Sequence, residues 1–217
     1  MKEIKEITKE KTKAIKNNDI SIKRKEEIVL ACEKLYKKMS FRDITIKDIA
    51  KETTFTRASI YNYFETKEEI FLALYEKEYY IWNDDLEEIL MSVKKFTKSS
   101  FADNIAKTLE KRVMLLKLMA MNNYDMEENS RLECLTSFKV AYLKTIATFS
   151  KLLSKFNPLL SKKDINDIIY MFYPFIYALY PYSHVTDKQM KAMELAGHKW
   201  NKNTIYKLTY NFMMRIL

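Results

Sequence analysis

The amino-acid sequence predicts an all-α protein, and three features of its composition lead to this fold class. It contains one Gly and three Pro among 217 residues, although a β-rich fold needs turn residues about every ten positions. Hydrophobic residues make up 47% of the chain and charged residues 31%, a balance typical of a globular protein. Apolar residues recur with helical spacing along most of the chain. A chain of this length can bury a large core in one or two domains.

Charge alone says little about partners. The formal net charge is +9, which would suit a nucleic acid. However, twenty basic and fourteen acidic residues follow residue 80, so most of the excess lies in the C-terminal part. Residues 1–20 are rich in Lys and Glu and have no apolar core. They are expected to form a frayed helix or a disordered arm, and no signal peptide is expected. The expected compartment is the cytoplasm.

An apolar stripe predicts the first stable helix over residues 22–39. Its members follow the spacing i, i+3, i+4, i+7, i+8 and i+11: Ile28, Ala31, Cys32, Leu35, Tyr36 and Met39. Phe41 and Ile44 come next and are expected to fill the corner before the following helix.

Three helix starts follow within about 22 residues. Thr45 with Asp48 three residues later is a capping box, in which hydroxyl and carboxylate satisfy backbone N–H groups reciprocally. Thr56 is a second N-cap and opens a helix over residues 57–64, and Thr66 with Glu69 is a third capping box. The first two helices are then about two turns long, too short to be stable alone. Such a pair is typical of the helix-turn-helix, whose second helix enters the DNA major groove.

The same stretch resembles the DNA-binding domain of TetR-type regulators. The resemblance spans residues 22–82 and rests on Phe41, Thr45-x-x-Asp48-Ile49-Ala50, the run from Thr56 to Phe64 (TRASIYNYF), and Lys67-Glu68-Glu69. One position departs from the family, which usually has Gly in the turn where this chain has Thr53-Thr54-Phe55. If that turn needs a positive φ, a β-branched Thr would be strained.

The second helix of the motif carries the expected DNA contacts. Ala58, Ile60 and Phe64 are expected to pack inward, which leaves polar side chains with guanidinium, hydroxyl and amide groups for phosphates and base edges. Either tyrosine could instead pack against a neighbouring helix. By resemblance, Thr45 and Lys67 bind phosphate at helix N-termini. The predicted DNA-binding residues are Thr45, Thr56, Arg57, Ser59, Tyr61, Asn62, Tyr63 and Lys67.

The sequence divides into three segments. Residues 1–20 form the arm, for which entry into the DNA minor groove is the alternative role. Residues 21–82 form the DNA-binding domain, with the helix-turn-helix at 45–64. Residues 83–217 form a helical bundle expected to bind an effector and to dimerise. One helix should run from Lys67 to Trp82, and Asn83-Asp84-Asp85 could restart another.

Longer helices are expected in the C-terminal domain, over residues 101–124, 128–156 and 203–217. Ser161 and Asp164 should cap a further one. Residues 168–186 carry no charge, but two prolines and five tyrosines make them a poor membrane span. A helix apolar nearly all round is instead expected to be buried in a core or in a subunit interface.

The resemblance implies a homodimer in which the last two helices of each subunit form a four-helix seam. The residues predicted for that seam are Ile168, Phe172, Ile176, Leu208 and Phe212. Methionine and aromatic side chains, which suit adaptable apolar pockets but also ordinary cores, predict an effector pocket. Its candidate residues are Met114, Met119, Tyr124, Phe138, Tyr142, Met171 and Phe175.

No enzyme site is expected. The two histidines, His184 and His198, belong to no metal-ligand motif, and the single Gly excludes the usual phosphate-binding loops. Cys32 and Cys134 are expected to be free thiols rather than a disulfide. No metal, cofactor or membrane is therefore predicted.

The expected function is a sequence-specific regulator that binds double-stranded DNA at a pseudo-palindromic operator and is released by a small apolar or aromatic effector. Repression rather than activation follows family habit alone. A helical protein–protein adaptor that has lost DNA binding is the rival hypothesis, and an enzyme is a more distant one.

Overall fold

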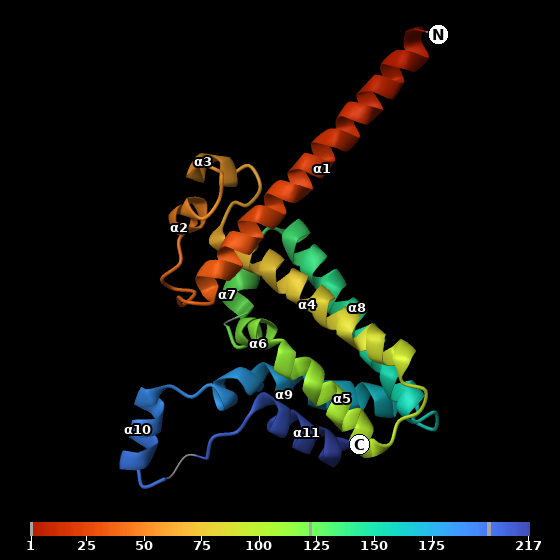
Figure 1. The fold of residues 1–217 in the computed structure, drawn as a ribbon, viewed down its shortest axis with the longest axis vertical. Coiled ribbons are helices and arrows are strands. Elements are labelled where there is room, and N and C mark those ends of the chain that lie inside the picture. Colours follow the sequence, from red (N-terminus) through yellow and green to blue (C-terminus); the bar gives the residue numbers. More distant parts are fainter. Residues whose placement is uncertain (1, 122, 199–200) are drawn as a thin grey trace. The chain divides into compact units, whose positions relative to one another are not determined.

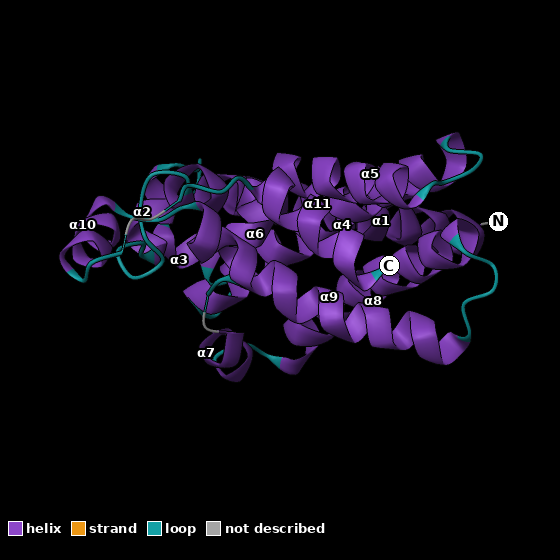
Figure 2. Cartoon of the chain, turned by 90° about the horizontal axis from the view of Figure 1, so that it is seen from below, coloured by secondary structure: helices purple, strands orange, loops and turns teal. Residues whose placement is uncertain are grey.

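The computed structural model describes residues 2–121, 123–198 and 201–217, with side chains from residue 19 onward except at 123. In these ranges the secondary structure consists of helices and loops (Figure 2), which confirms the all-α prediction. The helices are α1 (Lys2–Tyr36), α2 (Ile46–Lys51), α3 (Arg57–Ile60), α4 (Lys67–Ser92), α5 (Lys98–Lys111), α6 (Val113–Met119), α7 (Asn123–Glu128), α8 (Leu132–Phe156), α9 (Lys162–Ser183), α10 (Asp187–Leu195) and α11 (Ile205–Ile216) (Figure 1).

The chain forms two compact units. The first, called the head, comprises residues 1–74 together with 126–134, and the second, called the body, comprises 75–125 and 135–217. The chain therefore leaves the head inside α4, earlier than the expected boundary at residue 82. It returns to the head at the end of α7 and leaves it again inside α8. Nothing local in the sequence predicted this return.

The head is built on α1, α2, α3 and the start of α4. Tyr36 of α1 and Phe41 both meet Phe71 of α4 edge-on, with ring centroids 5.1 and 4.8 Å apart. Ile28 and Cys32 of the predicted α1 stripe are fully buried. The backbone of the expected arm continues α1 as a helix from Lys2. Lys and Glu are good helix formers, and no Pro or Gly interrupts residues 2–21.

Two predicted helix boundaries in the body are wrong. α4 runs through Asn83 without a break, because the buried Asn83 amide is satisfied by Glu87 at 2.8 Å and by Thr148 at 2.8 Å. The helix predicted over 101–124 is divided into α5, α6 and α7. It breaks first at Arg112 (φ −104°, ψ 45°), whose guanidinium binds both carboxylate oxygens of Asp85 at 2.6 and 2.7 Å.

The core of the body is aromatic. Trp82 is fully buried and donates its indole N–H to Thr108 at 3.1 Å, and Phe149 stacks on Phe172 with centroids 4.6 Å apart. α11 packs against α5 and α9, and α6 packs against α9. The predicted Ser161–Asp164 capping box at the start of α9 is confirmed. Within the described residues, no helix is both long and apolar enough to span a membrane.

Candidate nucleic-acid interface

Thr45 caps α2 at the start of the helix-turn-helix. Its hydroxyl oxygen accepts the backbone N–H of Asp48 at 3.3 Å, and its hydroxyl donates to the Asp48 carboxylate at 2.5 Å. The predicted reciprocal cap is thus half formed, because the Asp48 carboxylate accepts the Thr45 hydroxyl and only weakly the Thr45 backbone N–H. Hydrogen bonds from Thr45 and Lys51 lower the pKa of Asp48 to about 2. Thr45 remains exposed, in a position where phosphate can approach it.

The turn between α2 and α3 is held without the usual glycine. No described non-glycine residue has a positive φ, so the strain considered for Thr54 does not arise. Instead, the Glu27 carboxylate of α1 accepts the backbone N–H of Thr54 at 2.7 Å and its hydroxyl at 2.9 Å. Thr53 donates its hydroxyl to the Ala50 carbonyl at 3.0 Å. Side-chain hydrogen bonds therefore hold this turn in an ordinary backbone conformation.

Replacing Glu27 with alanine is expected to loosen this turn. The change leaves the N–H and hydroxyl of Thr54 without their acceptor, which costs about 1–3 kcal/mol of unfolding free energy. Urea unfolding followed by circular dichroism measures the loss. The matched control is Glu26→Ala, at the exposed neighbouring position, and it should change stability by less than about 0.5 kcal/mol. Equal stability of the two variants would contradict the role assigned to Glu27.

α3 forms one helical turn rather than the two predicted. It ends at Ile60, and turns with backbone bonds from Tyr63 and Phe64 to the Ile60 carbonyl continue it. Ile60 and Phe64 are buried as expected, at 0 and 4% exposure. Ala58 is exposed, and its inward prediction is wrong. Ala58 and Ile60 are two residues apart on a helix, so their side chains point in nearly opposite directions. The core of the head therefore cannot receive both.

The exposed face of α3 presents a cluster of hydrogen-bonding groups. The Arg57 guanidinium donates to the Tyr61 hydroxyl at 3.1 Å and lies 5.7 Å from the centre of its ring. The hydroxyls of Thr56 and Ser59 lie 2.9 Å apart, and Thr56 caps the helix through the Ser59 N–H. Asn62 is also exposed. The Arg57–Tyr61 pair pre-orders a cation beside an aromatic hydroxyl, an arrangement suited to phosphate or guanine.

Two other predicted DNA ligands are occupied within the head. The Tyr63 hydroxyl accepts a hydrogen bond from Arg24 of α1 at 3.2 Å. Tyr63 therefore contacts a neighbouring helix, which was the alternative to a DNA contact. Lys67 donates its ammonium to the carbonyls of Phe41 at 3.0 Å and Ile44 at 3.3 Å. The ammonium also lies 4.2 Å from the centre of the Phe41 ring, so Lys67 holds this corner of the head.

A buried ion pair in the head was missed by sequence reasoning. Arg131, at the connection between α7 and α8, binds Glu69 of α4, whose side chain is fully buried. The sequence predicted Glu69 as the capping partner of Thr66, whose hydroxyl oxygen does accept the Glu69 N–H at 3.2 Å, but did not predict an ion pair. The partners lie 62 positions apart in sequence, and no local pattern connects them.

The residues predicted for an effector pocket are not gathered around one space. Met119 and Phe138 are core residues at 1 and 3% exposure, whereas Tyr124 and Met171 are 86 and 46% exposed. Met114 is half-buried in α6, and Phe175 stacks on Phe212 of α11. Phe138 and Tyr142 alone meet a common ring, Tyr79. The candidates were chosen because they are methionine or aromatic residues, and this criterion does not distinguish pocket residues from core residues.

The interior around Tyr79 contains a tyrosine cluster from three helices. It comprises Tyr75 and Tyr79 of α4, Tyr142 of α8, and Tyr173 and Tyr177 of α9. The hydroxyls of Tyr75 and Tyr173 are buried and make no well-formed hydrogen bond with the described residues. The Tyr75 hydroxyl lies near those of Tyr79 and Tyr177 and interacts weakly with them. Burial raises the pKa of both phenols well above 10, so both hydroxyls stay protonated donors. Unsatisfied buried hydroxyls are uncommon and costly.

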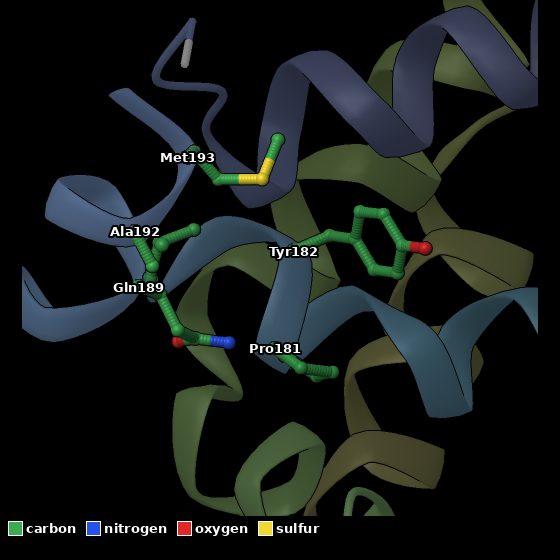
Figure 3. A pocket seen from close by; sticks show the side chains of 6 residues that line it. Pro181, Tyr182, Gln189, Ala192 and Met193 are labelled. Carbon is green, nitrogen blue, oxygen red and sulfur yellow. The ribbon is translucent and has the colours of Figure 1, made fainter. Parts of the chain in front are cut away.

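A cavity of about 340 Å³ lies between the end of α9 and α10 (Figure 3). Its walls are mostly apolar and are formed by Pro181, Tyr182, Val185, Gln189, Ala192 and Met193. Tyr182 and Met193 extend toward the same side of the space in Figure 3. None of the seven predicted pocket residues contributes to it. α10 was not predicted as a separate helix, and it has no buried residue.

The predicted seam residues divide into two groups. Ile168, Phe172 and Ile176 of α9 are 6, 0 and 0% exposed within the single chain, so they form its core, and this part of the prediction is corrected. They share the face of α9 that is turned inward. Leu208 and Phe212 of α11 are half-buried, and Phe212 stacks on Phe175 at 3.9 Å. The seam residues on α9 were predicted because they are apolar. Both faces of α9 are apolar, so this criterion did not distinguish the inward face from the outward one.

Metal and thiol chemistry find no support in the described part of the chain. No group of three or more His, Cys, Asp or Glu side chains there is placed to hold a metal ion. Cys32 and Cys134 are both free. Burial raises the pKa of the Cys32 thiol far above its ordinary value, which keeps it protonated and unreactive.

Comparisons with known proteins agree with this architecture. Residues 25–74 match the family model "Bacterial regulatory proteins, tetR family", and residues 76–204 match "Tetracyclin repressor-like, C-terminal domain". A crystal structure described as that of a TetR-family transcriptional regulator from Mesorhizobium loti MAFF303099 is similar over 89% of this chain and 94% of that chain. Its TM-score is 0.53 and its sequence is 14% identical, so this likeness concerns the fold alone. A search of curated proteins found no match.

Proposed function

Because the chain belongs to the TetR family of bacterial DNA-binding transcriptional regulators, we propose that it is a homodimeric repressor released from its operator by a small effector. The observation that carries DNA reading is the exposed face of α3, where Arg57 and Tyr61 pair beside Asn62. In a dimer, two such faces would bind half-sites one helical turn apart, about 34 Å. The protein would act in the cytoplasm, on a pseudo-palindromic site.

An Arg57→Ala, Tyr61→Ala double variant is expected to lose operator binding. The probes are the DNA upstream of the protein's own gene and a sequence that the wild type selects from a random pool. Fluorescence anisotropy at two salt concentrations should show tight, salt-sensitive binding by the wild type. The variant should bind at least about 100-fold more weakly, since each good base contact contributes about 1–3 kcal/mol.

The matched control for this variant removes a lysine and a tyrosine from the body. Tyr124 is 86% exposed and Lys202 is exposed, so Tyr124→Ala, Lys202→Ala should bind DNA like the wild type. Wild-type binding that shows no sequence preference on any genomic fragment would reject the repressor proposal. Binding by the double variant as tight as that of the wild type would place the reading surface elsewhere.

We propose the tyrosine cluster as the place where the effector acts. The buried hydroxyls of Tyr75 and Tyr173, which make no well-formed hydrogen bond, would each donate one to a carbonyl or similar acceptor on a planar, uncharged ligand. The rings of α4, α8 and α9 are packed together in the present structure. The ligand would therefore stabilise a second, more open state, and the resulting population shift would release DNA.

Replacing Tyr75 and Tyr173 with phenylalanine is expected to stabilise the protein without ligand. Each change keeps the ring and removes a buried hydroxyl that makes no well-formed hydrogen bond, which is worth about 1–2 kcal/mol. Thermal unfolding measures the gain. Tyr206→Phe is the opposite control, because the Tyr206 hydroxyl donates to Asp103 at 2.8 Å and its loss should destabilise. In a DNA-release screen, compounds active on the wild type should lose their effect on the Tyr75→Phe, Tyr173→Phe variant. Unchanged stability and release would reject this site.

The proposed dimer seam lies on the outward face of α9 together with α11. α9 has no charged residue from Ile168 to Ser183. Its outward face, called the α9 stripe, consists of Tyr170, Met171, Pro174, Phe175, Ala178, Pro181 and Tyr182, all exposed or half-buried. An uncharged exposed face of this length is typical of an interface. Pro181 and Tyr182 also line the α9–α10 cavity, so we assign that cavity to the edge of the seam.

A further inference from the structure

The segment 126–134 belongs to the head although it follows the helix-turn-helix by about 60 residues. It contains the end of α7, the connection to α8 and the first residues of α8. Two contacts tie it to the stretch between α3 and α4. The Thr66 hydroxyl donates to the carbonyl of Asn129 at 2.9 Å. Arg131 makes the second and larger contact.

Arg131 binds Glu69 with three donors. Its Nε and Nη2 atoms donate to Oε1 at 2.7 Å and Oε2 at 2.8 Å, and its backbone N–H donates to Oε1 at 3.0 Å. The Glu69 side chain is 0% exposed and that of Arg131 is 35% exposed. Two-pronged pairs of this kind have a defined geometry as well as strength. Arg131 is therefore fixed in position by a buried carboxylate.

The same guanidinium reaches the recognition segment. Nη2 of Arg131 also donates to the backbone carbonyl of Tyr63 at 3.2 Å. Tyr63 closes the turn after α3 through its bond to the Ile60 carbonyl at 2.9 Å. Glu69 completes the arrangement by accepting the backbone N–H of Glu65 at 2.8 Å. Arg131 and Glu69 together thus bind the backbone on both sides of Phe64, directly after the residues that face DNA.

α3 itself has little to hold it in place. It is a four-residue helix, far shorter than an isolated helix needs for stability. Its orientation therefore depends on its N-cap, on buried Ile60 and Phe64, and on what holds the chain after Phe64.

We propose that Arg131 is a positioning residue for DNA reading, which holds the end of the recognition segment through the Tyr63 carbonyl and Glu69. This proposal rests on the proposed function in one respect, namely that the face of Arg57, Tyr61 and Asn62 reads the operator. Arg131 directly precedes α8, which supplies Tyr142 to the tyrosine cluster. A displacement of α8 by a ligand would then reach the recognition segment through Arg131 and its partner Glu69 at the start of α4.

The experiment compares Arg131→Met and Arg131→Lys with the wild type on two DNA duplexes. One is the sequence that the wild type selects from a random pool, and the other is a scrambled duplex of the same composition. We expect Arg131→Met to bind the selected duplex at least about tenfold more weakly, with less than about threefold change on the scrambled duplex. Arg131→Lys, which keeps the charge without the planar fork, should fall between them.

The matched control is Arg112→Met. Arg112 binds Asp85 in the body with the same two-pronged geometry, at 2.6 and 2.7 Å, so its loss should lower thermal stability by a similar amount. It should leave the ratio of the two DNA affinities unchanged. A merely structural role for Arg131 predicts that Arg112→Met and Arg131→Met behave alike on DNA.

Hydrogen exchange gives a readout independent of DNA. The amides of Phe64 and Glu65 should exchange at least about tenfold faster in Arg131→Met, and unchanged rates would overturn the proposal. An unchanged affinity ratio, or an equal loss on both duplexes, would also overturn it. Should Arg131→Met fail to fold, Arg131→Lys and Glu69→Gln provide the same comparison. A wild type that selects no sequence rejects the proposed function, and the exchange rates still decide the role of Arg131.

Discussion

Replacing Glu69 with alanine is expected to lower the stability of the head by about 3–5 kcal/mol at neutral pH. A loss of this size would unfold many marginally stable domains. The substitution removes the acceptor of the Arg131 guanidinium, of the Arg131 N–H and of the Glu65 N–H. It leaves a partly buried cation and two backbone donors unsatisfied. Urea unfolding followed by circular dichroism measures the change, and Glu68→Ala, at the preceding position on α4, is the matched control.

The same carboxylate makes head stability depend on pH. Burial alone would raise the pKa of Glu69, but the hydrogen bonds from Arg131 and from the Glu65 backbone outweigh it and lower the pKa from 4.5 to about 2. A group whose pKa falls on folding contributes stability fully above its unfolded pKa and loses it as the pH falls through its folded pKa. At about 1.4 kcal/mol per pKa unit the contribution is at most about 3.5 kcal/mol, and solvent screening of the partly exposed Arg131 reduces it. It should disappear between about pH 4.5 and 2.

Glu69→Gln isolates this contribution, because glutamine keeps the shape and does not titrate. The difference in unfolding free energy between wild type and Glu69→Gln should be largest at pH 7 and should shrink as the pH falls below 4.5. Glu65 and Glu133, which lie 3.6 and 3.4 Å from Arg131, remain in both proteins and cancel in the comparison. A difference that stays constant from pH 7 to pH 3 would contradict the assigned role of Glu69.

The features predicted correctly from the sequence are those set by near neighbours. The N-caps Thr45, Thr56 and Ser161 all bind the backbone N–H three residues on, because a cap depends on its own turn of helix. The exposure of Arg57 and Tyr61 follows likewise from their spacing of four on a helix. These local rules were sufficient to predict the all-α class and the exposure of Arg57 and Tyr61.

The features that were missed depend on partners distant in sequence. Asn83 reads locally as a helix break, but Thr148 satisfies its amide from 65 positions away. Thr54 reads as a strained substitute for glycine, yet Glu27, 27 positions earlier, accepts both of its donors. Arg131 carries no local signal of membership in the head. Side-chain chemistry could suggest that such groups need partners, but only the tertiary fold identifies them.

The proposed effector site shows a different limit of sequence reasoning. Methionine and aromatic residues fill cores and line pockets alike, so Met119 and Phe138 could not be separated from pocket residues by type. What distinguishes the tyrosine cluster is its hydrogen bonding: the hydroxyls of Tyr75 and Tyr173 are buried and make no well-formed hydrogen bond within the described residues. Burial and hydrogen bonding are properties of the folded chain, and the number of tyrosines does not reveal them.

A carboxylate on the α9 stripe is expected to convert the proposed dimer to a monomer. Met171 is 46% exposed and lies on the stripe between uncharged neighbours. In a two-fold seam, Met171→Glu would bury a pair of like charges without counter-ions, which costs several kcal/mol. The dimer dissociation constant should rise at least about 100-fold. Sedimentation equilibrium distinguishes the 26.0 kDa chain from a particle of twice that mass.

Leu159→Glu is the control for this variant, since Leu159 is 91% exposed and lies between α8 and α9, off the stripe. It should leave the dimer intact. The Met171→Glu monomer should keep its helical circular dichroism and bind the selected operator much more weakly, because two linked half-site contacts become one. A Met171→Glu protein that remains dimeric would move the seam away from α9, and a wild type that sediments as a monomer would reject the dimer.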